Sequence, residues 1–123
     1  MNREIKFRAW DSLNKNMHEV YRINFKERIT VDSKLFEDDT RFLTLENTVL
    51  LQYTGEKDSN DVDIYEGDIG WDAHQECFGL VKFDEGKFVY TWANVCDNLW
   101  EMKEEIEIVG NIYENPELLE SQS

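Results

Sequence analysis

The stretch LLQYTGEKDSNDVDIYEGDI, residues 50–69, decides the fold of this chain. An apolar run begins it, and two glycines enclose a polar middle. That middle carries the five acidic residues Glu56, Asp58, Asp61, Asp63 and Glu66. Three interpretations follow from such a cluster: a metal-binding loop, a group of catalytic carboxylates, or a turn between two strands.

A calcium loop of the EF-hand type does not fit this stretch. If the loop began at Asp58, Val62 would take its fifth position, Asp63 its sixth and Ile69 its twelfth. Calcium loops need an oxygen ligand, a glycine and a glutamate at those positions. We therefore predict no metal site, although an adventitious divalent-ion site formed by Asp58, Asp61 and Asp63 stays an alternative.

Catalysis by these carboxylates is the second interpretation. Paired acidic side chains act as general acid and base only where burial or like charge separates their pKa values. Most acidic residues here have polar neighbours and lysine nearby, which favours ordinary solvated anions. The sequence also offers no nucleophile beside a base and no glycine loop for a phosphate. We predict no catalytic residues and no cofactor, and keep a metal-dependent hydrolase that uses the acids between 58 and 68 as an alternative function.

The third interpretation, a turn between strands, accounts for more of the residues. An apolar strand over 48–55 is expected to end at Gly55, and residues 56–61 are expected to form a polar loop. The chain then returns with Ile64 and Ile69 facing inward. The acidic cluster is therefore predicted to be structural.

A second, sharper bend is predicted where this stretch ends. Gly67 suits a positive φ, and the Asp68 side chain suits a hydrogen bond to nearby backbone. Tyr65 and Glu66 then belong to the corner of a folded sheet. We assign no functional site to these residues.

Alternating apolar and polar residues predict further strands on both sides of this stretch. They are expected over residues 4–10, 17–25, 27–33, 77–83, 87–93 and 104–113. The glycine-containing loop 84–86 predicts a tight hairpin between two of these strands. Residues 35–47 stay ambiguous between a helical turn and a loop.

Two short helical segments complete the predicted fold. Residues 94–102 are expected to form helical turns with Val95, Leu99 and Met102 on one side, and Pro116 is expected to begin a short terminal helix. The fold class is mainly β: a small barrel-like or folded antiparallel sheet with minor helical turns and a short C-terminal helix. At 123 residues, the chain is expected to be a single domain over residues 1–123.

The sequence indicates a cytoplasmic protein that does not contact the membrane. No apolar run is long enough to span a bilayer, and the first residues lack the apolar core of a signal peptide. Cys77 and Cys96 are then expected to be reduced thiols. Together with His18 and His74 they show no CxxC or HxxxH spacing, which argues against a zinc site.

The net charge of −14 is unevenly distributed. Residues 1–30 hold seven Lys and Arg against four acids, a net of +3, and residues 31–123 hold six against twenty-three, a net of −17. The basic N-terminal hairpin can relieve the self-repulsion of the acidic remainder, or the acidic surface can face a basic partner. Direct nucleic-acid binding is not expected, because phosphates repel such a chain.

Three segments resemble the motifs of the YopX family, which occurs in phages and prophages. They are KFRAWD (residues 6–11), the stretch 50–69 and IVGNIYENPELL (residues 108–119), in the family's order over nearly the whole chain. The resemblance implies a small, mainly β, barrel-like fold, a phage origin, no established activity and no catalytic residues to transfer. Where the family's loop typically has Asn-Gly, this chain has Asn60-Asp61, so Asp61 is expected to take a left-handed backbone conformation.

These observations favour a phage or prophage accessory protein that is not an enzyme and acts through protein contacts or self-assembly. The expected partner is a basic host or phage protein, or a second copy whose acidic sheet edge pairs with the basic first strand. An acidic nucleic-acid mimic that inhibits a host DNA-binding protein is an alternative. Most of the four tryptophans are expected in the core, and Trp10 and Trp100 are the candidate interaction surface.

Overall fold

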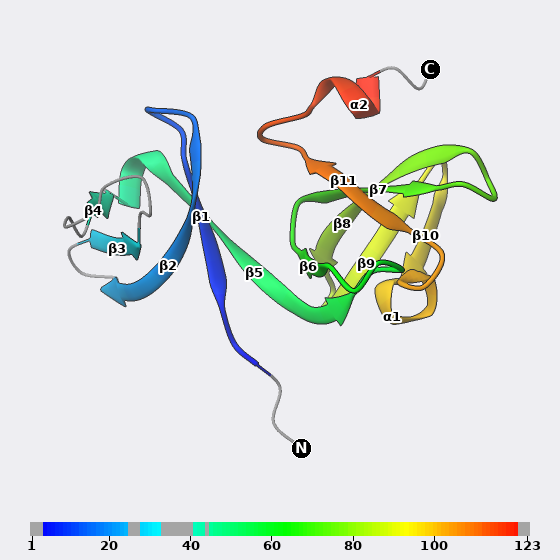
Figure 1. Cartoon of the computed structure of the whole chain (residues 1–123), viewed down its shortest axis with the longest axis horizontal. Coiled ribbons are helices and arrows are strands. Elements are labelled where there is room, and N and C mark those ends of the chain that lie inside the picture. Colours follow the sequence, from blue (N-terminus) through cyan, green and yellow to red (C-terminus); the bar gives the residue numbers. More distant parts are fainter. Residues whose placement is uncertain (1–3, 25–27, 33–40, 44, 121–123) are drawn as a thin grey trace. The chain divides into compact units, whose positions relative to one another are not determined.

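The computed structural model describes residues 4–24, 28–32, 41–43 and 45–120 (Figure 1). The chain divides into two compact units, of which one is Ile5–Gln52 and the other contains the described residues from Tyr53 onward. We call them the N-terminal unit and the C-terminal unit. The predicted class is confirmed: the described residues are mainly β and form two antiparallel sheets, one of them a curled half-barrel, and two short helices. The single domain over residues 1–123 stays a prediction.

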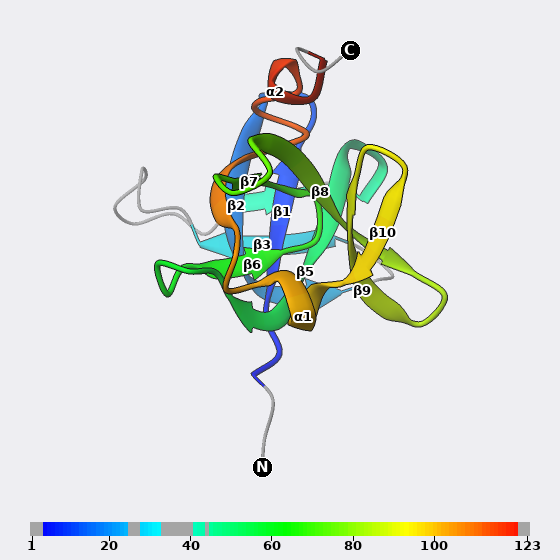
Figure 2. The ribbon, with the colours of Figure 1, turned by 90° about the vertical axis from the view of Figure 1, so that its right-hand side faces the viewer.

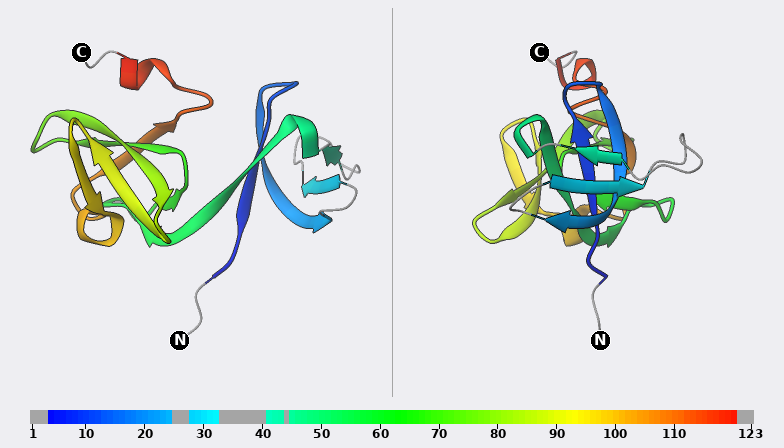
Figure 3. Two further views of the ribbon diagram at one scale, coloured as in Figure 1. Left: turned by 180° about the vertical axis from the view of Figure 1, so that it is seen from behind. Right: turned by 90° about the vertical axis from the view of Figure 1, so that its left-hand side faces the viewer.

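The N-terminal unit is built on an antiparallel sheet with the order β4-β3-β2-β1-β5 (Figure 3, right-hand view). Its strands are β1 (Phe7–Asp11), β2 (Asn16–Asn24), β3 (Arg28–Asp32), β4 (Arg41–Leu43) and the first half of β5 (Thr48–Lys57). A single 3-10 turn, η1 (Leu45–Asn47), precedes β5. The expected strands over 4–10, 17–25 and 27–33 form in the described residues as β1, β2 and β3, of which β1 begins only at Phe7, and the ambiguous segment contains β4 and η1. Residues 25, 27 and 33 lie outside the described residues, and so do residues 35–40 and 44 of the ambiguous segment.

The first strand is an interior strand of its sheet, whereas the expected pairing with a second copy requires a free edge. β1 lies between β2 and β5, and pairs with both of them. Ala9 and Trp10, which face opposite sides of the strand, are both buried. Because both edges of β1 are already hydrogen-bonded, it has no free edge for the strand of a second copy.

The C-terminal unit is organised around a five-stranded antiparallel sheet with the order β10-β9-β8-β7-β11 (Figure 2). The strands of this sheet are β7 (Asp68–Asp72), β8 (Cys77–Asp84), β9 (Lys87–Trp92), β10 (Val95–Asn98) and β11 (Glu107–Asn111). The unit also contains β6 (Asp63–Tyr65). The short β6 pairs with the second half of β5. Two short helices follow β10 and β11, α1 (Leu99–Met102) and α2 (Glu117–Glu120).

The core of the C-terminal unit combines residues from strands, a helix and a loop. It consists of Ile64, Val81, Tyr90, Leu99 and Ile106, each at most 1% exposed. Burying a side chain of this size stabilises the fold by about 1.5–3 kcal/mol. The expected inward direction of Ile64 is thus confirmed, and Ile69 is also fully buried.

The Tyr90 side chain, on β9, packs against Gly79 on β8 and Gly70 on β7. A Cβ atom at Gly79 would come within 2.3 Å of the Tyr90 ring, and one at Gly70 within 2.9 Å of its hydroxyl oxygen. Any larger residue at position 79 would displace the ring. Burial raises the pKa of the Tyr90 hydroxyl far above its usual range.

The hairpin between β8 and β9 forms as the sequence predicts. Its loop consists of Glu85 and Gly86, with φ values of 50° and 80°, and Asp84 pairs with Lys87. Two central residues with positive φ match the right-handed twist of the flanking strands. This turn places Phe83 opposite Phe88, whose ring centroids are 5.0 Å apart.

Two sequence-based expectations for the elements are wrong. β5 does not end at Gly55 but continues to Lys57, and Gly55, with a φ of 87°, lies in an irregularity of the β5–β6 pairing. Residues 95–98 are a strand and not helical, because a turn at Ala93, with a φ of 49°, folds them back onto β9. Of the expected helical segment 94–102 only Leu99–Met102 is helical, and Leu99 is buried there.

The C-terminal helix is confirmed, because α2 begins directly after Pro116 and the Pro116 carbonyl accepts hydrogen bonds from the backbone N–H groups of Leu119 and Glu120. None of the helices in the described ranges is long and apolar enough to cross a membrane.

Candidate functional site

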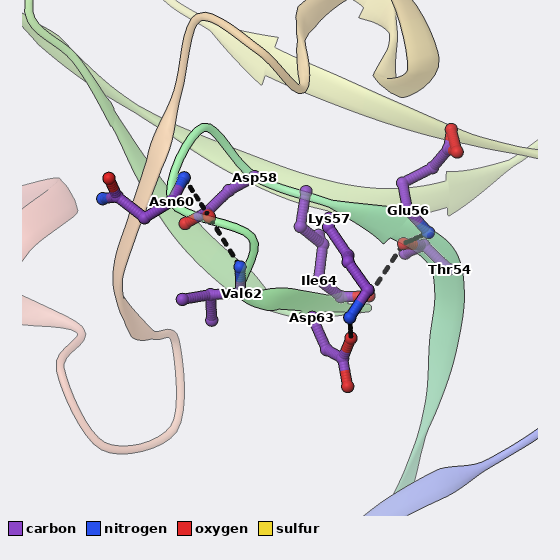
Figure 4. A network of polar contacts seen from close by, with 8 residues as sticks. All are labelled: Thr54, Glu56, Lys57, Asp58, Asn60, Val62, Asp63 and Ile64. Atoms are coloured by element: carbon purple, nitrogen blue, oxygen red, sulfur yellow. Dashed lines mark hydrogen bonds and ion pairs between the residues drawn. The ribbon is translucent and has the colours of Figure 1, made fainter.

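The central motif forms a loop whose buried carboxylate holds the backbone. Asp58 is 6% exposed, and its Oδ1 accepts hydrogen bonds from the backbone N–H groups of Asn60 at 2.8 Å and Val62 at 2.9 Å (Figure 4). Its Oδ2 accepts a third hydrogen bond, from the backbone N–H of Ile108 on β11, at 2.8 Å. One carboxylate therefore closes its own loop and fastens that loop to a strand fifty residues away.

The neighbouring polar side chains of the motif are also engaged. The Thr54 hydroxyl donates to the Ile64 carbonyl at 2.7 Å and accepts from the Glu56 N–H at 3.2 Å (Figure 4). Lys57 forms an ion pair with Asp63 at 3.1 Å. The hydrogen bond to Asp63 and the negative charge of that carboxylate raise the pKa of Lys57. These contacts tie β5 to β6.

The expected conformations of two loop residues are confirmed. Asp61 has a φ of 65° and takes the expected left-handed conformation. Gly67 has a φ of 88°, and Asp68 Oδ2 accepts a hydrogen bond from the Tyr65 N–H at 2.8 Å. The corner is thus built as expected, with the backbone of Tyr65 as the partner of Asp68.

The N-terminal motif uses an aspartate in the same way. Asp11 is 2% exposed, and its Oδ1 accepts from the backbone N–H groups of Leu13 and Asn14, while its Oδ2 accepts from the Asn14 side chain. Burial alone would raise the pKa of Asp11, but the hydrogen bonds from Asn14 and Leu13 outweigh it and lower that pKa. The turn between β1 and β2 is therefore held by a charged carboxylate.

The C-terminal motif repeats this arrangement with asparagine. Asn111 Oδ1 accepts from the backbone N–H groups of Tyr113 and Glu114, at 3.0 and 2.8 Å. The Asn115 side chain accepts from the Asn111 N–H at 3.2 Å and lies against Gly110, where a Cβ atom would come within 2.4 Å of it. Glycine is required at position 110 for this close approach.

The three aspartates of the alternative metal site do not come together. The Asp58 carboxylate is occupied by backbone N–H groups, Asp61 is exposed, and Asp63 is paired with Lys57. In the part of the chain that the structure describes, no group of three His, Cys, Asp or Glu side chains could hold a metal ion. The polar residues of the motifs thus serve turns and strand connections.

The two candidate interaction residues have very different environments. Trp100, on α1, is 64% exposed, whereas Trp10, on β1, is 8% exposed. Trp71 and Trp92 are partly buried, and Trp92 Nε1 lies 3.3 Å from the Asp97 carboxylate. Of the four tryptophans, Trp100 is the one that presents most of its surface to solvent.

Trp100 borders an open pocket of about 290 Å³ on the C-terminal unit. Three segments that are distant in sequence line it: Thr54, Gly55 and Glu56 from β5, Lys87 and Phe88 from β9, and Asn98, Leu99 and Trp100 from β10 and α1. We call this site the Trp100 pocket. Its apolar surface continues outside the lining, since Phe88 contacts Phe83, which is 52% exposed.

The sequence alone did not reveal this pocket, apart from Trp100. One signal was present, because Phe83 and Phe88 flank the predicted hairpin loop 84–86, and the two-residue loop that forms places them in register on adjacent strands. Two large apolar side chains side by side near an exposed turn indicate a surface apolar patch. The β5 contribution gives no such signal, since it depends on the continuation of β5 past Gly55.

The pocket lies in the unit that carries the whole net charge of the protein. Residues 53–123 hold four lysines against eighteen Asp and Glu, a net of −14, whereas residues 5–52 hold eight bases and eight acids. Two of the four lysines, Lys57 and Lys103, are in ion pairs with Asp63 and Glu56. The exposed acidic residues in and directly after α1 are Glu101, Glu104 and Glu105.

Comparisons with known proteins agree with this fold. A family model described as YopX protein matches residues 6–120. No curated protein matches the sequence. The chain is similar to the crystal structure of protein EF1440 from Enterococcus faecalis, with a TM-score of 0.70 and 27% sequence identity over 96% of this chain and 99% of that chain.

Proposed function

The chain belongs to the YopX family, and from that premise we propose that it is a non-enzymatic phage or prophage accessory protein that acts through protein contacts at the Trp100 pocket. The observation that carries the proposal is the 64% exposure of Trp100 beside an open, largely apolar pocket. Tryptophan is among the residues most enriched in the energetic centres of protein interfaces. Exposed apolar patches of this kind mark interaction sites on soluble domains.

The use of the motif residues supports the same proposal. Asp11, Asp58, Asp68 and Asn111 accept hydrogen bonds from local backbone, so their polar atoms are committed to the fold. Catalytic carboxylates need a free oxygen within reach of a substrate. Asp58 and Asp68 are held by backbone N–H groups and Asp63 by Lys57, which argues against the hydrolase alternative that uses the acids between 58 and 68.

The experiment that tests this function is affinity capture from host-cell lysate on the tagged protein, read by mass spectrometry at low and moderate salt. Three proteins are compared: the wild type, Trp100→Ala, and Leu13→Ala as the matched control. Leu13 is 72% exposed in the turn between β1 and β2, so its loss removes an exposed apolar side chain from the other unit.

We expect one protein to be enriched by the wild type and by Leu13→Ala at both salt concentrations, and to be lost with Trp100→Ala. Circular dichroism must show that Trp100→Ala remains folded, which its exposure predicts. Equal capture by Trp100→Ala would contradict the proposal.

An acidic nucleic-acid mimic is a second candidate, favoured by the concentration of all net charge in residues 53–123. A mimic would compete with DNA for a basic DNA-binding protein through charge spread over its surface. Its binding would fall steeply with salt and would be insensitive to Trp100→Ala. The capture experiment therefore separates the two candidates.

Self-assembly stays a prediction and needs a surface other than β1. The expected pairing of a basic first strand with an acidic edge is not available, because β2 and β5 occupy both edges of β1.

A further inference from the structure

We infer that the Trp100 pocket takes a basic segment of a partner protein, in which an arginine stacks on Trp100 and an adjoining apolar side chain enters against Phe88 and Leu99. This inference rests on the proposed function and adds the chemistry of the partner. Three independent features of the C-terminal unit support it: the charge around the pocket, the exposed aromatic surface, and the apolar lining.

The charged residues at the pocket, Glu56, Asp84 and Glu101 against Lys87 and Lys103, leave a small net negative charge. Glu56 lines the pocket, and Glu101 lies next to Trp100 in the chain, where its carboxylate accepts a hydrogen bond from the Asn98 side chain at 2.9 Å. Lys103 already pairs with Glu56 at 3.4 Å. Lys87 is the one cation among the lining residues, and Asp84 stands opposite it in the strand register.

The wider field has the same sign. Residues 53–123 carry a net charge of −14, so an approaching basic segment is attracted before it reaches the pocket. Nucleic acids and anionic lipid surfaces are repelled by that field. A basic stretch of protein is therefore the macromolecule that fits the site.

The aromatic surface favours arginine over lysine. The planar guanidinium stacks on an indole face and keeps its N–H donors free at its edge, whereas an ammonium is a compact, strongly hydrated charge. With Trp100 64% exposed on a unit of net charge −14, a stacked arginine gains from the charge of the unit as well as from the indole face. This combination distinguishes the site from a purely acidic surface.

The lining favours an apolar side chain next to that arginine. Leu99 is 1% exposed and belongs to the core, and Phe88 is half-buried and packs against the same core. A volume of about 290 Å³ admits one side chain of the size of leucine or phenylalanine. The fitting segment therefore has arginine and large apolar residues close together.

The test is fluorescence anisotropy with a labelled synthetic peptide of alternating arginine and leucine, capped at both ends. Matched peptides carry lysine or glutamate in place of arginine. Each is titrated with the full-length wild type, Trp100→Ala, Glu101→Gln and the control Glu120→Gln. Glu120 is exposed on α2, at the opposite end of the C-terminal unit from α1, and its substitution removes the same charge from that unit (Figure 1).

We expect the arginine peptide to bind the wild type, and Trp100→Ala to weaken it about thirty-fold, the loss typical of an interface hot spot. Glu101→Gln is expected to weaken it roughly threefold at low salt and less at moderate salt, and the lysine peptide to bind roughly threefold more weakly than the arginine peptide. Glu120→Gln should bind like the wild type, and the glutamate peptide should not bind.

Equal binding to the wild type and Trp100→Ala would overturn the inference, and so would equal binding of the arginine and glutamate peptides. Sedimentation of the protein alone tests whether a second copy of the chain occupies the pocket instead. A dimer that Trp100→Ala dissociates would assign the pocket to a second copy and also overturn the inference.

The outcome for the proposed function is read separately, from the capture experiment. If lysate capture depends on Trp100 but the arginine peptide does not bind, the protein-contact function stands and the partner chemistry is wrong. If neither lysate capture nor peptide binding depends on Trp100, the proposed function and the inferred partner chemistry are both wrong.

Discussion

Asp61 is a non-glycine residue whose backbone takes the left-handed conformation, with a φ of 65°. Aspartate tolerates this region better than alanine does, and glycine adopts it without steric cost. We predict that Asp61→Gly equals or exceeds the wild type in stability by up to about 1 kcal/mol, and that Asp61→Ala loses about 1 kcal/mol. Urea unfolding of the three proteins measures this order. An alanine variant as stable as the glycine variant would show that the conformation costs nothing.

Asp11 makes the stability of the protein dependent on pH. Its pKa is lowered from its ordinary value of 3.8 in the folded protein, because Asn14 and Leu13 donate hydrogen bonds to the charged carboxylate and outweigh the effect of burial. The stabilisation is therefore present above that ordinary value and is lost as the pH falls through the lowered pKa. We predict that Asp11→Asn costs about 1 kcal/mol at neutral pH and that this difference shrinks under acidic conditions. Urea unfolding of both proteins at neutral and acidic pH gives the difference, which should not grow on acidification.

At the scale of elements, the β8–β9 hairpin and its neighbours depend on two glycines for different reasons. A Cβ at Gly79 would clash with the Tyr90 ring at 2.3 Å, while Gly86 has open space around it and only a φ of 80° to maintain. We predict that Gly79→Ala costs at least about 2 kcal/mol, as expected of overpacking in a core, and Gly86→Ala about 1 kcal/mol. Thermal unfolding ranks them. If Gly86→Ala were the more damaging, Tyr90 would not be held as tightly as the geometry indicates.

The elements also show where sequence reasoning succeeds and where it fails. The alternation around Ile64 and Ile69 sets which residues are buried, and Gly86 marks the turn of the β8–β9 hairpin, so both could be predicted. The register with Asp84 opposite Lys87 differs from that of the expected loop 84–86. Gly55 could not be placed, because a glycine with positive φ suits a strand irregularity as well as a turn. Residues 95–98 could not be identified as a strand, because the spacing of Val95, Leu99 and Met102 fits a helix. Periodicity in so short a segment does not distinguish a helix from a strand.

At the scale of the whole molecule, the functional site was harder to predict than the fold. Trp100 could be singled out because it lies in a polar part of the sequence. The pocket beside it is formed by residues 54–56, 87–88 and 98–100, which only the folded C-terminal unit brings together. The charge pattern was visible in the sequence, but its division into a neutral unit and a unit of net charge −14 required the boundary at residue 53.

The acidic motif of residues 50–69 maintains the fold, while Trp100 remains available for contacts. Urea unfolding of Asp58→Ala and Trp100→Ala under identical conditions tests this division of roles. Asp58→Ala leaves three backbone N–H groups without their acceptor, so we predict a loss of about 3 kcal/mol or more in the free energy of unfolding. Trp100→Ala removes a side chain that is 64% exposed, and should cost less than about 1 kcal/mol. The reverse order, with a stable Asp58→Ala and a strongly destabilised Trp100→Ala, would contradict the account.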